Sequence, residues 1–215
     1  MSNHRPDPIE QLTNGFRTTQ VLFTANRLNL FQTIANKKYT YDQLANELDC
    51  DPRGMRILCD ALASLNILNK ENGYYKNSNV AFEYLLPDSP QSKCAILRHN
   101  ARLYESWGKL FDSVKEGASV PKEKIDPRLW GDEEDFAKAM ADVARQSAQQ
   151  TVEKLDLNGV ARMLDVGGGP GLYSIQCALH YPKLQSWILD DAKTLDVAQQ
   201  NIDQAGVSDR VFPKP

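Results

Sequence analysis

The chain has 215 residues, of which 41% are hydrophobic and 25% are charged, the balance of an ordinary water-soluble protein. This composition excludes collagen-like, fibrous and disordered proteins. The formal net charge of -3 provides no overall attraction for nucleic acid or for an anionic membrane. No stretch approaches the roughly 20 apolar residues of a membrane span, so we expect a cytoplasmic protein that binds neither nucleic acid nor membrane.

The cysteines show no pattern of a metal site or of a disulfide framework. Cys50, Cys59, Cys94 and Cys177 form no CxxC pair, and no histidine-rich segment accompanies them. We therefore expect reduced, buried thiols and no bound metal.

The N-terminal part of the chain has the pattern of a winged helix. Apolar residues between Ile9 and Ala35 recur at spacings of three and four, which predicts one or two amphipathic helices. Thr40 can cap a second helix, with Gln43 at the capping-box position. Another helix is predicted after Pro52, and Glu71-Asn72-Gly73 then indicates a hairpin. Helix, turn, helix and hairpin in this order predict a winged helix.

The middle of the chain is predicted to be helical. One helix is expected from Lys93 to Glu116, followed by a loop from Gly117 to Pro127. The next helix, from about Asp132 to Leu155, opens with an acidic run that suits the positive end of a helix dipole. We expect it to bury four apolar side chains: Phe136, Met140, Val143 and Val152.

The last part of the chain alternates strand and helix. An apolar strand over Arg162–Val166 precedes a helix that Pro182 stops, and a second strand over Ser186–Asp190 precedes a helix over Ala192–Ala205. A third strand is expected to begin at Arg210. This alternation predicts a parallel sheet. Two such helices cannot cover both faces of a doubly wound sheet, so we expect a chain truncated at its C-terminus.

A glycine-rich loop, Gly167-Gly168-Gly169-Pro170-Gly171, joins the first of these strands to its helix. Its glycines let the main chain approach a ligand closely and leave N–H groups available at the start of the helix. Asp165 precedes the loop. Asp190 ends the next strand, where a carboxylate can accept hydrogen bonds from both ribose hydroxyls. This combination predicts a nucleotide site.

Other glycine motifs fit the loop less well. The dinucleotide fingerprint G-x-G-x-x-G fails from Gly167, where Leu172 replaces the third glycine, and from Gly168, where Pro170 replaces the second. No Lys-Ser/Thr pair follows, so a P-loop is excluded. The alternative is a purely structural turn, with Asp165 and Asp190 as solvated charges. Asp191 is expected to cap the next helix.

The segment from Leu164 to Gly171 resembles motif I of class I S-adenosylmethionine-dependent methyltransferases, in the form favoured by the O-methyltransferase family of plant phenolic and bacterial polyketide enzymes. The order of the predicted parts resembles this family from about Gly15 onward. The resemblance implies a mainly α winged-helix dimerisation domain (9–90), a helical linker that covers the substrate (91–155), and the first half of an α/β Rossmann-like domain (156–215).

The resemblance also implies a cofactor and a reaction. S-adenosyl-L-methionine would be bound by Asp165, Gly167, Gly168, Gly169, Gly171 and Asp190, and its methyl group transferred to a hydroxyl of a small aromatic or polyketide-like molecule. His99, Trp107 and Met140 are candidates for the substrate pocket, although such positions are also typical of a helix core or a polar helix face. The family's catalytic histidine would lie beyond Pro215, so no catalytic residue is assigned.

Two rival functions stay open, as do carbon or nitrogen acceptors on the same fold. One rival is a DNA-binding regulator that uses the winged helix. Between Tyr41 and Leu86, however, seven acidic residues outnumber four basic ones, the opposite of what phosphate binding needs. We therefore expect the N-terminal helices to form a homodimer instead. The other rival is a non-catalytic, truncated scaffold.

Overall fold

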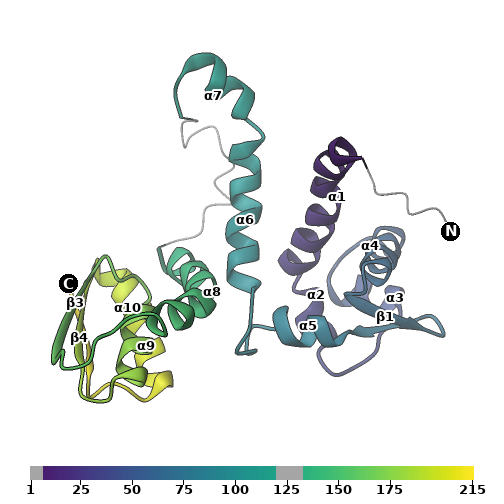
Figure 1. The fold of residues 1–215 in the computed structure, drawn as a ribbon. Coiled ribbons are helices and arrows are strands. Elements are labelled where there is room, and N and C mark those ends of the chain that lie inside the picture. The colour runs from purple at the N-terminus through teal and green to yellow at the C-terminus, as the bar shows by residue number, and fades with distance from the viewer. Residues whose placement is uncertain (1–6, 120–132) are drawn as a thin grey trace. The chain divides into compact units, whose positions relative to one another are not determined.

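The computed structural model describes residues 7–119 and 133–215 (Figure 1). The chain forms two compact units, residues 1–101 and residues 102–215. The division into 9–90, 91–155 and 156–215 concerns finer boundaries and stays a prediction. Within the described ranges, no helix combines the length and the apolar character that crossing a membrane requires.

The first unit opens with two helices, as expected from its apolar spacing. α1 (Pro8–Arg27) begins where Asp7 accepts a hydrogen bond from the Ile9 N–H at 3.0 Å. Asn29, in the left-handed region at φ 55°, turns the chain into α2 (Leu30–Ile34). α3 (Tyr41–Glu47) then begins with the predicted capping box, in which the Thr40 hydroxyl accepts from the Gln43 N–H and the Gln43 side chain accepts from the Thr40 N–H.

The rest of this unit completes the winged helix. α4 (Pro52–Ser64) is capped by the Asp51 carboxylate, which accepts from the Gly54 N–H at 2.8 Å. β1 (Leu68–Glu71) and β2 (Tyr74–Asn77) pair antiparallel across the predicted turn. A short helix that the sequence did not predict, α5 (Asn79–Tyr84), follows.

A continuous apolar core stabilises the first unit, and a cluster of polar side chains connects α4 to the hairpin. The largest fully buried side chains of the core are Leu30, Phe31, Ile34, Leu44, Met55, Leu62, Leu68 and Tyr75. The Asp60 carboxylate of α4 accepts hydrogen bonds from Lys70 Nζ and from the Tyr75 hydroxyl, both at 2.6 Å. These bonds hold the pKa of Asp60 below its usual value. The cluster therefore ties α4 to both strands of the hairpin.

The prediction of a single helix from Lys93 to Glu116 is wrong. The structure has α6 (Cys94–Trp107) and α7 (Leu110–Glu116), separated at Gly108 and Lys109. The Lys109 N–H bonds the Ser106 carbonyl three residues back, at 3.1 Å, so the last turn tightens and a new helix begins. Glycine favours such a break because it is a poor residue for a helix interior. The loop expected up to Pro127 lies largely outside the described residues.

The predicted buried face of α8 (Glu133–Val152) is only partly right. Val152 is buried and Met140 half-buried, but Phe136 and Val143 are 50% and 54% exposed. The buried residues of α8 include four alanines: Ala137, Ala139, Ala141 and Ala148. Their small side chains let α8 pack closely against the two helices that follow it. Asp132, the first residue of the acidic run, lies outside the described residues.

Three parallel strands form the sheet of the second unit, in the order β3-β4-β5. They are β3 (Arg162–Val166), β4 (Gln185–Leu189) and β5 (Val211–Lys214), connected by α9 (Leu172–His180) and α10 (Ala192–Ala205). The predicted α/β order is confirmed. Because Val166 pairs with Leu189, β3 and β4 end side by side.

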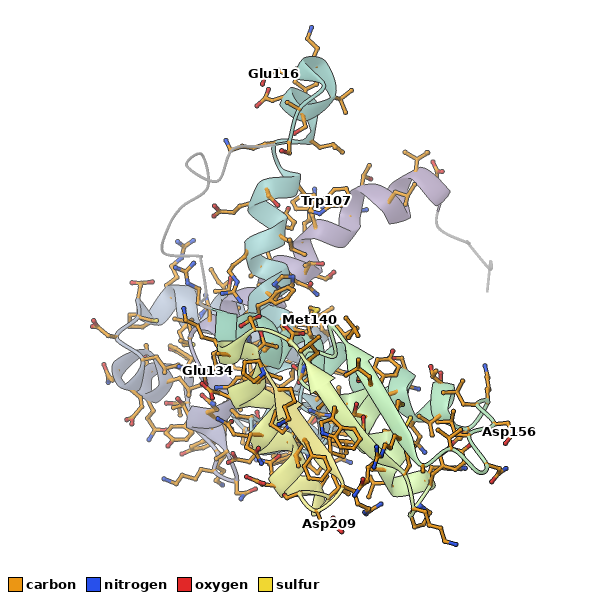
Figure 2. All side chains as sticks on the ribbon, turned by 90° about the vertical axis from the view of Figure 1, so that its left-hand side faces the viewer. Trp107, Glu116, Glu134, Met140, Asp156 and Asp209 are labelled. Carbon is orange, nitrogen blue, oxygen red and sulfur yellow. The ribbon has the colours of Figure 1, made fainter. Side chains whose placement is uncertain are left out.

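Helices cover one face of this sheet (Figure 1). The core on that face comprises Ile175, Ala178, Ile188, Leu195, Ala198, Ile202, Val207 and Val211. The opposite face of the sheet faces the viewer in Figure 2. On it, the side chains of Leu164 and Val166 are 61% and 71% exposed. No described element covers these two side chains.

Candidate functional site

The glycine-rich loop follows the carboxyl end of β3 and leads into α9. The Gly167 N–H donates to the Leu189 carbonyl at 2.8 Å, which extends the pairing of β3 with β4 by one residue. Gly171 is the N-cap of α9 and has no side chain to cap the helix. The loop therefore places main-chain amides at the positive end of a helix, where an anionic or polar ligand group is stabilised.

Two positions in this loop accept only glycine. At Gly168, a Cβ atom would lie 2.7 Å from Cγ of Asp165. At Gly171, a Cβ atom would lie 2.7 Å from Cδ1 of Ile188, and the backbone has a φ of 78° that L side chains rarely adopt. The loop is thus packed onto β3 and β4 by its own main chain.

Asp190 lies against this loop. Its Oδ2 accepts a hydrogen bond from the Gly169 N–H at 2.8 Å, and its Oδ1 accepts from the Asp191 N–H at 2.8 Å. The residue directly follows β4, which ends at Leu189, and its side chain is half-buried. The carboxylate and the glycine loop therefore form one site at the adjacent ends of two parallel strands.

Asp191 has the separate role expected for it. Its carboxylate accepts hydrogen bonds from the Thr194 N–H at 3.0 Å and the Thr194 hydroxyl at 2.8 Å, which caps α10. These bonds lower the pKa of Asp191. Asp190 is therefore the acidic residue of this pair that faces the loop.

Asp165 lies beneath the loop. Its Oδ2 accepts a hydrogen bond from the Ser174 hydroxyl at 2.7 Å, and the Ser186 hydroxyl donates to Ser174 Oγ at 2.8 Å. The Asn201 side chain also donates to the Pro170 carbonyl at 2.8 Å. The sequence alone did not predict roles for Ser174, Ser186 and Asn201. The available signal was that both serines occupy the apolar face of their element, next to Ile175 and two residues before Ile188.

The three candidate substrate residues lie in different parts of the chain. His99 is half-buried in α6 and belongs to the first unit, whereas Trp107 and Met140 belong to the second. Trp107, labelled in Figure 2 at the end of α6, is 65% exposed and therefore not a core residue. Met140 lies half-buried in α8.

A cavity of about 350 Å³ lies at the other end of the sheet. It is lined by Leu157–Ala161 and Tyr181–Leu184, the segments that immediately precede β3 and β4. In a parallel sheet, the amino ends of all strands lie at one end of the sheet and their carboxyl ends lie at the other. This cavity is therefore separate from the glycine loop.

Two family models match the chain. Residues 10–87 match the O-methyltransferase dimerisation domain, and residues 124–212 match the O-methyltransferase domain. The first match covers the winged helix, and the second covers α8, the glycine loop and the sheet as far as residue 212 in β5.

Curated relatives match over most of this chain. Acetylserotonin O-methyltransferase of Macaca mulatta is 30% identical over 210 residues, which are 90% of this chain and 61% of the relative. The 3-hydroxy-5-methyl-1-naphthoate 3-O-methyltransferase of Streptomyces sahachiroi is 28% identical over 211 residues, 96% of this chain and 61% of the relative. The chain thus spans about three fifths of the length of these relatives.

Solved structures agree with the family match. The crystal structure of human N-acetylserotonin methyltransferase in complex with SAM superposes with a TM-score of 0.80 at 26% identity, over 99% of this chain and 67% of that one. An O-methyltransferase family protein from Burkholderia thailandensis gives 0.76 at 24% identity, over 96% of this chain and 62% of that one, and shows the fold. The chain therefore belongs to the O-methyltransferase family that joins a dimerisation domain to an O-methyltransferase domain.

Proposed function

We propose that the protein is an S-adenosyl-L-methionine-dependent methyltransferase that acts on a hydroxyl group of a small aromatic or polyketide-like molecule. The observation that carries this proposal is the contact between the Asp190 carboxylate and the Gly169 N–H, beside a loop packed down onto the sheet. The dimerisation and O-methyltransferase domain matches and the relatives named above support it.

The residues of the site fit this cofactor. At Gly167 and Gly169, no atom lies within 4 Å of where a Cβ would be, so a ligand can approach the main chain there. Asp190 would accept hydrogen bonds from the two ribose hydroxyls, and the whole proposed binding set is Asp165, Gly167, Gly168, Gly169, Gly171 and Asp190. When bound, S-adenosylmethionine supplies an electrophilic methyl group on its sulfonium sulfur.

The chain's own contribution to the reaction is alignment. Methyl transfer depends on holding the donor carbon and the acceptor oxygen in line, more than on covalent help from the protein. We assign His99, Trp107 and Met140 to the substrate pocket, and Trp107 supports this because it is a large aromatic side chain exposed at the end of α6. A flat aromatic acceptor would stack on such a surface.

The protein would act as a homodimer through its first unit. Exposed apolar residues line the start of α1, namely Ile9, Leu12 and Phe16, and Leu12 is 80% exposed. Such a row on one helix is typical of a surface that a second subunit covers. The matched dimerisation domain begins at residue 10, in this same helix.

The polar contacts of the winged helix support a small-molecule enzyme over a DNA-binding regulator. In the hairpin, Lys70 is paired with Asp60 and Lys76 with Glu71 at 3.1 Å, and in α4 the cations are Arg53 and Arg56. Phosphate contacts need an excess of unpaired positive charge. We also place the protein in the cytoplasm, because its four cysteines are all free thiols and three of them are buried.

The reaction is tested by incubating the protein with S-adenosylmethionine and a panel of phenols, naphthols and hydroxyindoles. Mass spectrometry should detect S-adenosylhomocysteine together with a product heavier by one methylene group. Methylation of carbon would revise the acceptor atom, since one relative at 29% identity is an L-tyrosine C(3)-methyltransferase. Absence of any methylated product across the panel, in protein that binds the cofactor, would contradict the proposed substrate class.

A further inference from the structure

A chain of three polar side chains, two of them buried, runs under the glycine loop. It starts at Ser186 in β4, passes through Ser174 in α9 and ends on Asp165 in β3, with oxygen–oxygen distances of 2.8 and 2.7 Å. Both serines have no exposed surface. Because a buried hydroxyl without a partner destabilises a fold, two adjacent ones facing a carboxylate indicate a connected network.

The network reaches the loop through Asp165. A Cβ atom on Gly168 would come within 2.7 Å of the Asp165 Cγ and 2.9 Å of its Oδ2, so this carboxylate occupies the space directly beneath the loop. The Asp165 oxygen that faces Gly168, Oδ2, is the same one that accepts a hydrogen bond from the Ser174 hydroxyl. Rotation of the Asp165 side chain would therefore both move the carboxylate away from Gly168 and break that hydrogen bond.

The supported segment also carries the contact to Asp190. Gly169, which donates to Asp190 Oδ2, directly follows Gly168. Asp165 and Asp190 thus lie next to two consecutive residues of the loop, Gly168 and Gly169. Asp165 faces inward toward α9, which leaves Asp190 facing the loop.

We propose that Ser174 and Ser186 are positioning residues for the cofactor loop. By donating along the Ser186–Ser174–Asp165 chain, they fix the Asp165 carboxylate under Gly168 and so hold the Gly169 N–H toward Asp190. This inference rests on the proposed S-adenosylmethionine site and adds two residues that do not touch the cofactor. A hydrogen bond to a charged acceptor is among the stronger ones, which makes Ser174 the more sensitive of the two positions.

The test compares three single substitutions in the whole chain. Ser174→Ala and Ser186→Ala each remove one hydroxyl of the network. Ser208→Ala is the matched control, because it removes a hydroxyl that donates to the Asp203 carboxylate at 2.8 Å, on the far end of α10. Two quantities are measured for each: the Kd for S-adenosylmethionine by calorimetry, and the hydrogen-exchange rate of the Gly169 amide relative to the Ala198 amide of α10 by NMR.

We expect Ser174→Ala to raise the Kd about tenfold and Ser186→Ala to raise it less. In both variants the Gly169 amide should exchange faster while the Ala198 amide is unchanged, an effect that general loosening of the fold would not produce. Ser208→Ala should match the wild type in both measurements.

The other possible results also decide whether Ser174 and Ser186 are positioning residues. A Ser174→Ala protein with wild-type Kd and wild-type Gly169 exchange would overturn the positioning role, as would equal losses in Ser208→Ala. If wild-type protein does not bind S-adenosylmethionine, the proposed function fails, and the Gly169 exchange rate alone decides on the positioning role. If Ser174→Ala does not fold, Ser186→Ala is judged by the same criteria.

Discussion

The winged helix and the Rossmann-like sheet bury their apolar residues differently. In the first unit, helices and hairpin surround one core, and side chains such as Phe31 and Leu62 are buried from all sides. In the second, the helices cover one face of the sheet, while Leu164 and Val166 on the other face are exposed. The first unit is therefore stabilised by packing within itself, whereas the sheet keeps exposed apolar side chains on one face.

The same substitution in both units should reveal this difference most strongly. Leu62→Ala removes a fully buried side chain from the first core and should lower the free energy of unfolding by about 2–5 kcal/mol. Leu164→Ala, on the exposed face, should change it by less than about 0.5 kcal/mol. Urea unfolding followed by circular dichroism measures both. Equal losses would show that Leu164 is buried in the protein in solution.

A glycine pair tests whether the covered face of the sheet is as tightly packed as the first core. Gly171 and Gly206 both have positive φ, but only at Gly171 would a Cβ meet another side chain, Ile188. Gly206→Ala should cost about 1–2 kcal/mol from backbone strain alone. Gly171→Ala should cost more and also weaken cofactor binding. Thermal unfolding with calorimetric titration tests this, and identical behaviour of the two variants would indicate loose packing around Ile188.

The smallest expected effect concerns the polar cluster of the first unit. Asp60→Asn should destabilise the protein by about 0.5–1 kcal/mol at neutral pH, because Asp60 is partly exposed and its ion pair is screened. The folded-state pKa of Asp60 is lowered, so its stabilisation is present above about pH 4 and disappears as the pH falls through the folded pKa.

The stability difference between wild type and Asp60→Asn should therefore shrink as the pH is lowered below about 4. Lys76→Gln, which breaks the more exposed Lys76–Glu71 pair, is the control and should have almost no effect at any pH. A difference for Asp60→Asn that stays constant down to pH 2 would contradict the assigned contacts.

Local signals made most of the fold predictable from the sequence. The capping box at Thr40, the hairpin at Asn72-Gly73 and the cap at Asp191 are each set by residues within three positions of one another, and each is present in the structure. Side-chain packing was harder to predict. Phe136 and Val143 follow a helical period, yet α8 buries its alanines because close approach to α9 and α10 favours small side chains.

The residues of the candidate site also fall into two groups, those predicted from local motifs and those that depend on tertiary packing. Gly169 and Asp190 were predicted because the loop and the strand end are motifs with fixed spacing, and their proximity follows from parallel pairing of β3 and β4. Ser174 and Ser186 were missed because their partnership with Asp165 joins three separate elements. Only the register of the strands and the rotation of α9 bring them together.

The most direct test of the proposed cofactor site is calorimetric titration of S-adenosylmethionine into the wild type and into Asp190→Ala. We predict binding to the wild type and a loss of at least about tenfold in affinity in the variant, because the carboxylate would hold both ribose hydroxyls. Asp191→Asn, beside it in the sequence, should retain most of the affinity, since Asp191 caps α10. No binding to the wild type, or equal affinity for wild type and Asp190→Ala, would contradict the assignment of this site.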